Sequence, residues 1–471
     1  MTNTVEIGSD VELAKLTITQ ITDNLGDFFF DDSQFWTYQE TEWAILTVES
    51  IHRIIMGYDG ALFGEKGIVK LNQSRLKSIT AIIMGLVKRE GFFTDPKAGI
   101  NCLNGFIEFG PAGARRIPHD RAHACRHTIQ ANWHKKVDLT GSKFAKYLKV
   151  LGNALGDQNL LDLLQEVGGA AVAGYGARLI QSKAIILIGP DANNGKSEWM
   201  ELLCRMVPAS AATTLPPGDF KRPEYRVHLV GKLLNTADEL STANVISSDL
   251  FKTIITGNRV NARDLYLGMV SFKPKALHVF AANRRPSFIG GLDAGVRRRL
   301  LLIAFAKSIP EEDRVAGIVD TLIKDEMELV LSWMVEGASR LITNGRYTIP
   351  ASLEEALQEW DSESDTAKEW ITNRVRQDPT AADYTEFGLY RHYKFWAEER
   401  GYGKYILGKK EFVARFKEVM PGVIGKRTTT SKQTVHGIRV LATDNGEDHY
   451  EAKHPDEPGE MTYTSEVIER V

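Results

Sequence analysis

The sequence is poor in cysteine and in long apolar runs, and both shortages narrow the class of protein. Only three cysteines, Cys102, Cys125 and Cys204, occur among 471 residues, and their wide spacing argues against a disulfide framework. No apolar run approaches the roughly 18 residues that a membrane-spanning helix needs. Glu12 and Lys15 interrupt the first apolar cluster, which does not fit a secretory signal peptide. We therefore expect a cytoplasmic protein that does not enter a membrane.

The composition is that of a globular protein with an uneven distribution of charge. The chain is 43% hydrophobic and 25% charged, and its length has room for about three domains. Its net charge is only −3, but residues 221–300 carry 14 Lys/Arg against 6 Asp/Glu, and residues 390–440 carry 12 against 4. Two basic blocks suggest a polyanionic partner, although a solvated surface is the alternative. The acidic tail, 443–471, has 9 acidic and 2 basic residues, and we expect it to be disordered.

A short apolar run followed by a glycine-containing loop lies near the middle of the chain. Residues 183–199 read KAIILIGPDANNGKSEW, which predicts a strand over 184–188, a loop, and a helix that begins near Lys196. A glycine loop before a helix lets backbone N–H groups approach phosphate oxygens. Lys196 would reach the β- and γ-phosphates of a nucleoside triphosphate, and Ser197 would bind Mg²⁺. Five residues, rather than the usual four, separate Gly189 from Gly195, so either the turn is longer or Gly189 is not equivalent.

Polar residues follow two further β-like runs. KLLNTADEL ends at adjacent carboxylates: Asp238 would belong to the shell of the metal, and Glu239 would orient the attacking water. A helix-capping Asp-Glu pair is the alternative. ALHVFAANRRP ends its apolar run at Asn283, whose side chain can sense the γ-phosphate or position water. Arginines 297–299 precede a final apolar run, and a guanidinium offered to a neighbouring copy would be an arginine finger.

The region before this nucleotide-binding candidate is predicted to be mainly helical. Apolar spacing indicates helices over 42–57, 74–90 and 141–181. Aromatic residues gather between positions 28 and 43, where core packing is favoured over base stacking. Segment 100–134 has short β-like pieces and a group of histidines and a cysteine: His119, His123, Cys125, His127 and His134. A zinc site is weighed there and not favoured, because no paired ligand motif completes it.

The motifs GPDANNGKS, LLNTADEL, GNRVNARDLY…SFKPKALHVFAANRRP and GVRRRLLLIAF together resemble those of the superfamily 3 helicases. More narrowly, they resemble the helicase part of poxvirus-type and satellite-phage-type replication primase-helicases, over roughly residues 70–375. The resemblance implies an α/β, AAA+-like P-loop ATPase that uses ATP and Mg²⁺. It also implies a ring, usually a hexamer, that moves 3′→5′ on single-stranded DNA.

Individual roles follow from matching the motifs of this family. The phosphate-loop residues are Gly189, Asn194, Gly195, Lys196 and Ser197. Asp238 and Glu239 match the second motif and Asn283 the sensor asparagine; Arg299, or next to it Arg298, matches the finger. The DNA-contacting hairpin of the family falls on GNRVNARDLYLGMVSFKPK, whose tip carries Leu265 and Tyr266 where several relatives are basic. We therefore expect Lys252, Arg263 and Lys273 to contact phosphates and Tyr266 to stack on a base, with a packing role for Arg263 as the alternative.

The C-terminal part predicts a second nucleic-acid candidate. Helices over 311–375 would brace the ATPase core through residues such as Trp333, Leu357, Trp360, Trp370 and Ile371. Beyond them, helices over 386–400 and 409–419 and a β-like pair over 423–430 and 433–441 suggest a winged-helix-like module. Its wing would be charged by four basic residues: Lys426, Arg427, Lys432 and Arg439. A plain oligomer-contact domain is the alternative.

These observations predict six segments: a mainly helical N-terminal domain (1–140), a helical collar (141–180), the ATPase core (181–310), a helical brace (311–380), the winged-helix-like module (381–442) and the acidic tail. The predicted function is an ATP-dependent DNA helicase in the replication of a phage, virus or mobile element, in the host cytoplasm. No Asp-x-Asp pair suggests a primase or polymerase in the N-terminal part, so a partner protein would supply priming. An origin-melting initiator and a nucleotide-switched DNA-binding assembly protein remain alternatives.

Overall fold

The structure is a computed structural model, and its described residues form two compact units. The description covers residues 5–65, 67–157, 159–189, 193–240, 246–264, 268–283, 286, 288, 292–351, 353, 366–381, 383–400, 402, 406–427 and 433–441. The first unit comprises Met1–Pro286 and Ala294–Glu355, and the second comprises Ser287–Asp293 and Ala356–Val471. Within the described ranges, no helix has the length and apolar character required to cross a membrane. The three cysteines are free thiols.

The N-terminal part of the first unit mixes helices and strands, so the prediction of a mainly helical region 1–140 was wrong. Its elements are α1 (Asp10–Leu25), β1 (Phe28–Asp31), β2 (Gln34–Gln39), β3 (Glu42–Leu46), α2 (Val48–Met56), β4 (Leu62–Phe63), β5 (Gly67–Ile68), α3 (Gln73–Leu86), β6 (Ile100–Cys102), β7 (Gly105–Gly110) and β8 (Gly113–Ile117). Strands β1, β2 and β3 form one antiparallel sheet, and β6, β7 and β8 form another.

The error arose at the aromatic segment, where tight turns interrupt what was expected to be helical. Asp32, Ser33 and Glu40 have positive φ angles and reverse the chain between β1, β2 and β3. Thr47 then caps α2 by accepting a hydrogen bond from the backbone N–H of Ser50, so residues 42–57 form a strand and a helix. The prediction that the aromatic residues pack in a core is confirmed: Phe29, Phe35, Trp36 and Trp43 are buried.

A five-stranded parallel sheet organises the rest of the first unit and confirms an α/β fold. Its strands are β9 (Ala184–Ile188), β10 (Ala212–Thr213), β11 (Leu234–Ala237), β14 (Leu277–Ala282) and β15 (Leu300–Ala304). Their order across the sheet is β10-β11-β14-β9-β15, and every neighbouring pair is parallel. Strand β9 was predicted with the same bounds. Because it lies beside both β14 and β15, its carboxyl end meets theirs at one edge of the sheet.

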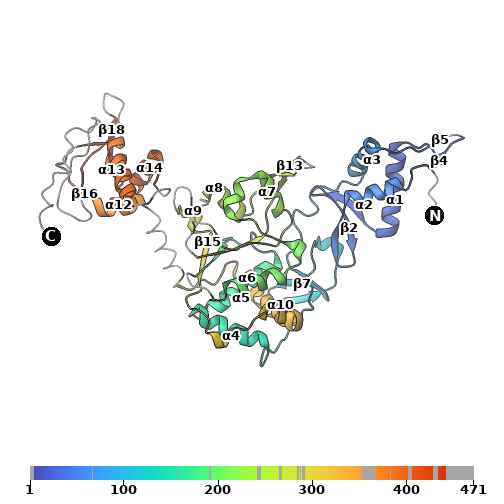
Figure 1. The fold of residues 1–471 in the computed structure, drawn as a ribbon, viewed down its shortest axis with the longest axis horizontal. Coiled ribbons are helices and arrows are strands. Elements are labelled where there is room, and N and C mark those ends of the chain that lie inside the picture. Colours follow the sequence, from blue (N-terminus) through green and yellow to red (C-terminus); the bar gives the residue numbers. More distant parts are fainter. Residues whose placement is uncertain are drawn as a thin grey trace. The chain divides into compact units, whose positions relative to one another are not determined.

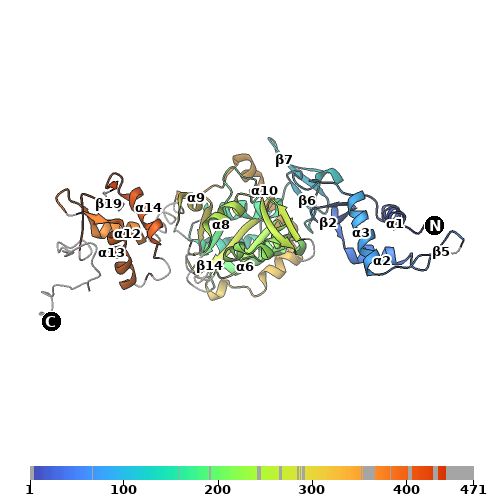
Figure 2. The same ribbon diagram turned by 90° about the horizontal axis from the view of Figure 1, so that it is seen from above.

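Helices pack against this sheet. On one side in Figure 1 lie α4 (Lys143–Leu155), α5 (Asn159–Ala173), α6 (Lys196–Met206) and α10 (Ile318–Asn344). Above it are α7 (Pro223–Arg226), α8 (Ser248–Ile255) and the hairpin of β12 (Val260–Asp264) and β13 (Gly268–Phe272), and α9 (Ala294–Arg297) precedes β15. Figure 2 views the same elements from above. Short 3₁₀ turns occupy Arg121–His123, Ala209–Ala211, Pro217–Lys221, Val227–Leu229 and Glu311–Asp313.

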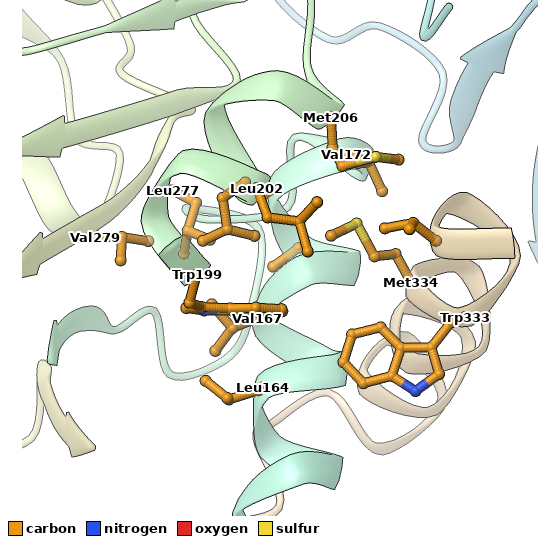
Figure 3. Close-up of a cluster of buried hydrophobic side chains, with 14 of the residues drawn as sticks. Leu164, Val167, Val172, Trp199, Leu202, Met206, Leu277, Val279, Trp333 and Met334 are labelled. Carbon is orange, nitrogen blue, oxygen red and sulfur yellow. The ribbon is translucent and has the colours of Figure 1, made fainter. Parts of the chain in front are cut away.

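Glycines allow α5 and α10 to pack closely against each other. A Cβ at Gly169 would lie 2.3 Å from the backbone nitrogen of Ala338, and one at Gly337 would lie 2.1 Å from the carbonyl oxygen of Gln165. Apolar side chains fill the interface between these helices, α6 and β14 (Figure 3), among them Leu164, Val167, Trp199, Leu202, Leu277, Val279, Trp333 and Met334. Helix α10, which follows the sheet in the chain, thus shares an apolar core with α5 and α6.

A buried ion pair joins the same two helices. Glu166 of α5 is fully buried, and its Oε1 accepts hydrogen bonds from Arg340 Nε at 2.8 Å and from Thr348 Oγ1 at 2.7 Å. Its Oε2 accepts one from the backbone N–H of Thr348 at 2.7 Å. Arg340 also donates to Gln165 Oε1 and to the carbonyl oxygen of Asp162. The carboxylate is therefore held by three donors, which is what a buried charge requires.

The second unit contains a compact helical core with small β-pairs. Its elements are α12 (Thr366–Arg374), β16 (Val375–Gln377), β17 (Tyr384–Thr385), α13 (Glu386–Glu399), α14 (Lys409–Val419), β18 (Ile424–Arg427), β19 (Gln433–Val435) and β20 (Ile438–Val440). Strands β17, β19 and β18 form one sheet, and β16 pairs with β20. The two predicted helices are confirmed, and the predicted β-like pair holds β18, β19 and β20.

The predicted boundary near residue 380 was wrong. Trp370 and Ile371 of α12 were expected to brace the ATPase core, but they belong to the apolar core of the second unit. The ring of Trp370 lies 5.6 Å from that of Phe412 and 6.1 Å from that of Tyr393, both in edge-to-face geometry. An amphipathic helix has the same pattern whichever core it covers, so periodicity could not assign α12 to its unit. Leu357 and Trp360 lie outside the described residues, as does the acidic tail.

Candidate functional site

The loop between β9 and α6 has the backbone conformation that its glycines predict. Gly195, the residue before α6, has φ +89°, and Asn193 has φ +58°. A Cβ at Gly189 would lie 2.3 Å from Asn194 Nδ2, 2.8 Å from Lys196 Nζ and 2.9 Å from the carbonyl oxygen of Phe305. No side chain fits at Gly189, and the left-handed backbone at Gly195 favours glycine. Residues 190–192 of the predicted loop lie outside the described part of the chain.

Lys196 begins α6 and folds back toward the loop. Its Nζ donates a hydrogen bond to the carbonyl oxygen of Gly189 at 2.6 Å, and the side chain is 7% exposed. Asn194, which is also buried, places its Oδ1 3.4 Å from the backbone nitrogen of Lys196. Ser197, in contrast, is exposed in the first turn of α6. The ammonium group is thus held at the loop, and the serine hydroxyl faces away from the core.

The two carboxylates and the asparagine lie at the same edge of the sheet. Asp238 and Glu239 directly follow β11, and both are exposed. Glu239 has φ +54°, a left-handed conformation that is uncommon outside glycine. Asn283 follows β14, and its Nδ2 lies 3.4 Å from Glu239 Oε1 as a hydrogen-bond donor. The structure therefore brings together two residues that are 44 positions apart in the chain.

Strand register places the glycine loop at this edge as well. Ile188, the last residue of β9, pairs with Ala282, the last residue of β14. Gly189 and Asn283 are the next residues on these neighbouring strands, so the loop and the asparagine begin at the same level. Parallel strands place their carboxyl ends at one edge, where α/β proteins bind ligands. The structure thus gathers the loop, both carboxylates and Asn283 into one site.

The segment after β15 also contacts the loop, and sequence reasoning missed it. The backbone N–H of Phe305 donates to the carbonyl oxygen of Ile188 at 2.7 Å, and that of Ile309 donates to the carbonyl oxygen of Asn193 at 2.7 Å. Ile309 Cδ1 would lie 3.3 Å from a Cβ at Gly195. Backbone contacts of this kind leave no motif in a sequence, so nothing in the printed chain could have revealed them.

The arginines lie at the opposite end of the sheet. Arg299 directly precedes β15, whose first residue, Leu300, pairs with Ala184, the first residue of β9. The glycine loop follows the last residue of that five-residue strand, about 16 Å away along a strand rising roughly 3.3 Å per residue. Arg299 Nε donates to Thr256 Oγ1 at 2.8 Å and its Nη1 to the carbonyl oxygen of Gly295 at 2.7 Å, whereas Arg298 is exposed. The structure therefore does not bring either arginine to the glycine loop of its own chain.

The segment proposed to contact DNA forms a β-hairpin. Arg263 pairs across the strands with Met269, and both are exposed. Lys252 of α8 forms an ion pair with Asp249, with 3.0 Å between Nζ and Oδ1. Lys273 follows β13 and is exposed. Tyr266, expected to stack on a base, lies outside the described residues.

The histidines and cysteine of segment 100–134 have separate surroundings. His119 Nδ1 lies 2.9 Å from Asn101 Oδ1, His134 Nε2 lies 3.0 Å from Glu328 Oε2, and the ring of His123 lies against Phe106. His127 Nε2 donates to the carbonyl oxygen of Gly231, and burial raises the pKa of the Cys125 thiol to about 12. No group of three or more His, Cys, Asp or Glu side chains within the described ranges could hold a metal ion.

The basic residues of the second unit have varied environments. Arg439 of β20 forms an ion pair with Asp378, with 2.5 Å between Nη2 and Oδ2. Lys426 and Arg427 belong to β18, and Lys432 lies outside the described residues. Arg439, which was expected to charge the wing, is thus partly neutralised within its own unit.

Comparisons with known proteins match one segment of the chain to a family without an assigned function. Residues 187–299, about a quarter of the chain, match a family described as a family of unknown function, DUF5906. This match begins within β9 and includes the glycine loop, both carboxylates and Asn283. A search among curated proteins found no match.

Solved structures with some likeness to the chain include those of the C-terminal region of a protein named NrS-1. "The A form apo structure of NrS-1 C terminal region-CTR" has a TM-score of 0.47 at 12% identity and covers 90% of this chain and 98% of its own. "The apo structure of NrS-1 C terminal region (305-718)" has a TM-score of 0.45 at 12% identity, with 91% and 99% covered. At these values the likeness establishes neither a shared fold nor a shared activity.

Proposed function

We propose that the first unit binds and hydrolyses ATP at the carboxyl edge of its parallel sheet. The observation that carries this proposal is the convergence of the glycine loop, Asp238, Glu239 and Asn283 on neighbouring strand ends, with Glu239 and Asn283 in contact. Phosphate binding needs backbone N–H groups and a cation, and hydrolysis needs a group that orients water. These four elements supply all three requirements.

Each residue has a role that its position supports. The absence of a side chain at Gly189 lets Asn194 and Lys196 pack against the start of the loop. Lys196 would exchange its bond to the Gly189 carbonyl oxygen for phosphate oxygens. Glu239 would accept a hydrogen bond from the attacking water, and the amide of Asn283 would hold that carboxylate in place.

The residues also suit a magnesium ion. Ser197 and Asp238 offer exposed oxygen atoms at the start of α6 and the end of β11, and Mg²⁺ in such sites takes few protein ligands because phosphates and waters supply the others. The lack of a three-residue acidic cluster in the described ranges is therefore compatible with this ion. When bound, Mg²⁺ would neutralise charge on the phosphates.

We further propose that chains assemble into a ring, usually a hexamer, in which Arg298 serves the site of a neighbouring copy. An arginine at the far end of the sheet cannot reach the nucleotide of its own chain, and only a second copy would present it there. Arg298 suits this role better than Arg299, because Arg299 is hydrogen bonded to Thr256 and Gly295. This proposal changes the order of the two candidates expected from the motif.

The ring would move 3′→5′ along single-stranded DNA during replication of a phage, virus or mobile element, with priming by a separate primase or polymerase. Support comes from the order of the sequence motifs and from the exposed Arg263 on the β12–β13 hairpin. Lys252 and Lys273 would add phosphate contacts. Their contribution is testable because each contact that is lost lowers the salt dependence of binding.

Mixing of inactive variants tests the shared site directly. Glu239→Gln removes the water-orienting group, and Arg298→Ala removes the finger; each alone should lower ATP hydrolysis by about 10²-fold or more. In mixed rings, an intact site on one chain meets an intact finger on the next, so hydrolysis should partly return. Arg297→Ala is the matched control and should hydrolyse ATP like the wild type. Absence of complementation, with normal assembly, would refute the shared site.

An origin-melting initiator is a second candidate, because the second unit places two helices, α13 and α14, beside a three-stranded sheet. This order of helices and strands suits a winged-helix-like module that reads duplex DNA. Footprinting on duplex DNA distinguishes the two functions: protection at one sequence favours the initiator, and uniform weak binding favours the translocase. A nucleotide-switched assembly protein would instead hydrolyse ATP slowly and without regard to DNA.

A further inference from the structure

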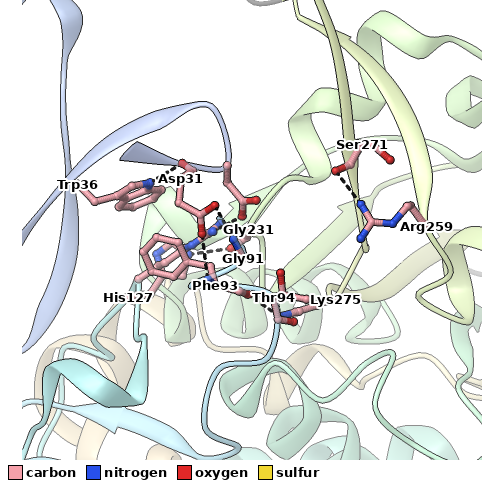
Figure 4. A network of polar contacts seen from close by, with 12 residues as sticks. Asp31, Trp36, Gly91, Phe93, Thr94, His127, Gly231, Arg259, Ser271 and Lys275 are labelled. Atoms are coloured by element: carbon pink, nitrogen blue, oxygen red, sulfur yellow. Dashed lines mark hydrogen bonds and ion pairs between the residues drawn. The ribbon is translucent and has the colours of Figure 1, made fainter. Parts of the chain in front are cut away.

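A basic cavity lies in the first unit, away from the carboxyl edge of the sheet. Its volume is about 560 Å³, within the range of ligand pockets. The walls come from segments far apart in the chain: the end of β1, residues 90–101 and 124–129, the end of α5, residues 230–233, and the base of the β12–β13 hairpin. Figure 4 shows the polar contacts around it.

Cations outnumber carboxylates in the lining by seven to three. The carboxylates all have partners. Asp31 accepts hydrogen bonds from the backbone N–H groups of Gly91 and Phe93, each at 3.1 Å. Asp32 pairs with Arg126, whose guanidinium also lies over the ring of Phe93, and Glu90 pairs with Lys88. None of the three forms an ion pair with the other lining cations that the structure describes.

Five cations of the lining have no carboxylate partner among the described residues. Lys275 Nζ donates to the carbonyl oxygens of Phe93 and Thr94 at 3.0 and 2.9 Å, and Lys232 Nζ to that of Ser210 at 2.6 Å. Arg178 donates to the carbonyl oxygen of Pro96 at 3.1 Å, and Arg259 to that of Ser271 at 3.4 Å. Lys273 forms no hydrogen bond or ion pair with the described part of the chain.

Carbonyl oxygens satisfy these donors without cancelling their charge. Burial and the nearby Arg178 and Arg126 lower the pKa of Lys275 to about 8, which reflects the cost of gathering cations in a partly enclosed space. An anion in the cavity would remove this cost. The cations also differ in depth: Arg259 and Lys273 are exposed, whereas Arg178, Lys232 and Lys275 are half-buried.

We propose that this cavity holds the phosphate backbone of a single-stranded DNA segment, as a second contact surface beyond the hairpin. Arg259, Ser271 and Lys273 belong to both the cavity wall and the base of the β12–β13 hairpin, so the cavity continues the hairpin surface that carries Arg263. Cations distributed over several depths match successive phosphates of a strand. The choice of DNA as the polyanion rests on the proposed function.

The first test compares two double variants that remove the same charge. Lys232→Gln/Arg259→Gln alters the cavity, and Lys146→Gln/Lys149→Gln alters two exposed lysines of α4 outside it. Binding of a labelled oligothymidine is measured by fluorescence anisotropy at several salt concentrations. Loss of two phosphate contacts should weaken binding up to about 25-fold at 0.1 M salt and reduce the salt slope by about 1.4. The α4 variant should bind like the wild type.

The second test measures whether DNA covers the cavity lysines in the unmodified chain. Amine-reactive labelling, followed by mass spectrometry, should show Lys232 and Lys275 protected by oligothymidine. Equal protection by inorganic phosphate would show a small-anion site and overturn the proposal. Absence of protection, or equal DNA affinity of the two double variants, would also overturn it. If the wild type still shows DNA-stimulated ATP hydrolysis in those cases, only the cavity inference fails; if it binds no DNA at all, the proposed function fails as well.

Discussion

The carboxyl edge of the parallel sheet and the basic cavity are built in different ways. At the sheet edge, short motifs follow β9, β11 and β14, and three strands of one sheet set the position of every group. The cavity is lined by several segments that lie far apart in the chain, and four of its cations donate hydrogen bonds to carbonyl oxygens. At the sheet edge, the strand ends fix the position of each functional group. In the cavity, an excess of positive charge is spread over the lining.

This difference predicts how each region responds to substitution. At the sheet edge, one atom would be decisive, because the proposed hydrolysis would depend on a single oriented water. In the cavity, each cation adds a similar small share to a summed potential. Single substitutions should therefore be severe at the sheet edge, and mild and additive in the cavity.

Glu239→Gln should have the largest effect. The amide keeps the size of the side chain but cannot act as a base, so ATP hydrolysis should fall by about 10²- to 10⁴-fold. ATP binding, measured by equilibrium dialysis, should stay within a few-fold of the wild type. Unchanged hydrolysis would show that Glu239 does not take part in the reaction. It would also show that a single substitution at the sheet edge need not be severe.

Glu166→Ala tests whether both regions depend on one rigid support. Helix α5 packs on α6 beside the glycine loop, and its end, Val172 to Gly174, lines the cavity. Loss of this fully buried carboxylate leaves Arg340 without its ion-pair partner, so the free energy of unfolding should fall by about 3–5 kcal/mol. Urea denaturation measures it. Glu201→Ala breaks an exposed contact on α6 and should cost below about 0.5 kcal/mol.

Gly189→Ala tests whether ATP binding requires the close packing around Gly189 at the sheet edge. The added methyl would lie 2.3 Å from Asn194 Nδ2 and 2.9 Å from the Phe305 carbonyl oxygen, so backbone or side chains must shift at a cost of about 1–3 kcal/mol. ATP affinity should fall by about 10-fold or more in titration calorimetry. At Gly110 a Cβ meets nothing within 4 Å, and Gly110→Ala should retain wild-type affinity.

His278 predicts the response of the sheet to acid. Burial lowers its pKa to about 3, and Nδ1 accepts a hydrogen bond from Asn235 Nδ2, which requires the neutral ring. Its contribution to stability is full above about pH 6.5, the ordinary pKa, and is lost as the pH falls toward 3. Between pH 6.5 and 5, up to about 2 kcal/mol should disappear.

Thermal and urea unfolding at several pH values check this prediction. In His278→Phe the loss of stability with acid should be smaller, because the phenylalanine side chain does not bind a proton. Asn235 Nδ2 still donates a hydrogen bond to the carbonyl oxygen of Leu215 in this variant. The exposed His228 provides the control, and His228→Phe should keep the wild-type profile. An unchanged slope in His278→Phe would show that other groups set the acid response.

A single change in the cavity should have the smallest effect. Arg259→Gln removes one cation of five, so DNA affinity should fall by at most about 5-fold at 0.1 M salt, with the salt slope lower by about 0.7. Anisotropy titrations measure both. If Arg259→Gln lowered DNA affinity as much as the double variant of the cavity does, the cavity would also depend on one decisive contact. The two regions would then not differ in this respect.

The two regions also differ in how well the sequence predicts them, because local motifs form the sheet edge and scattered residues form the cavity. Strand β9, Lys196, Glu239 and Asn283 could be placed because each motif follows an apolar run, and parallel strands carry their ends to one edge. Arg178, Lys232 and Lys275 carry no local pattern, and only the packing of the N-terminal part against the sheet brings them together. For the same reason, apolar periodicity predicted helix α12 but not the unit whose core contains Trp370.

We propose that DNA-dependent ATP hydrolysis occurs at the carboxyl edge of the sheet. Its most direct test is the rate of ATP hydrolysis with and without single-stranded DNA, for the wild type and for Lys196→Ala. We expect strong stimulation by DNA in the wild type and almost no hydrolysis in the variant, which should remain folded. Slow hydrolysis that ignores DNA, or equal rates in both proteins, would contradict the claim.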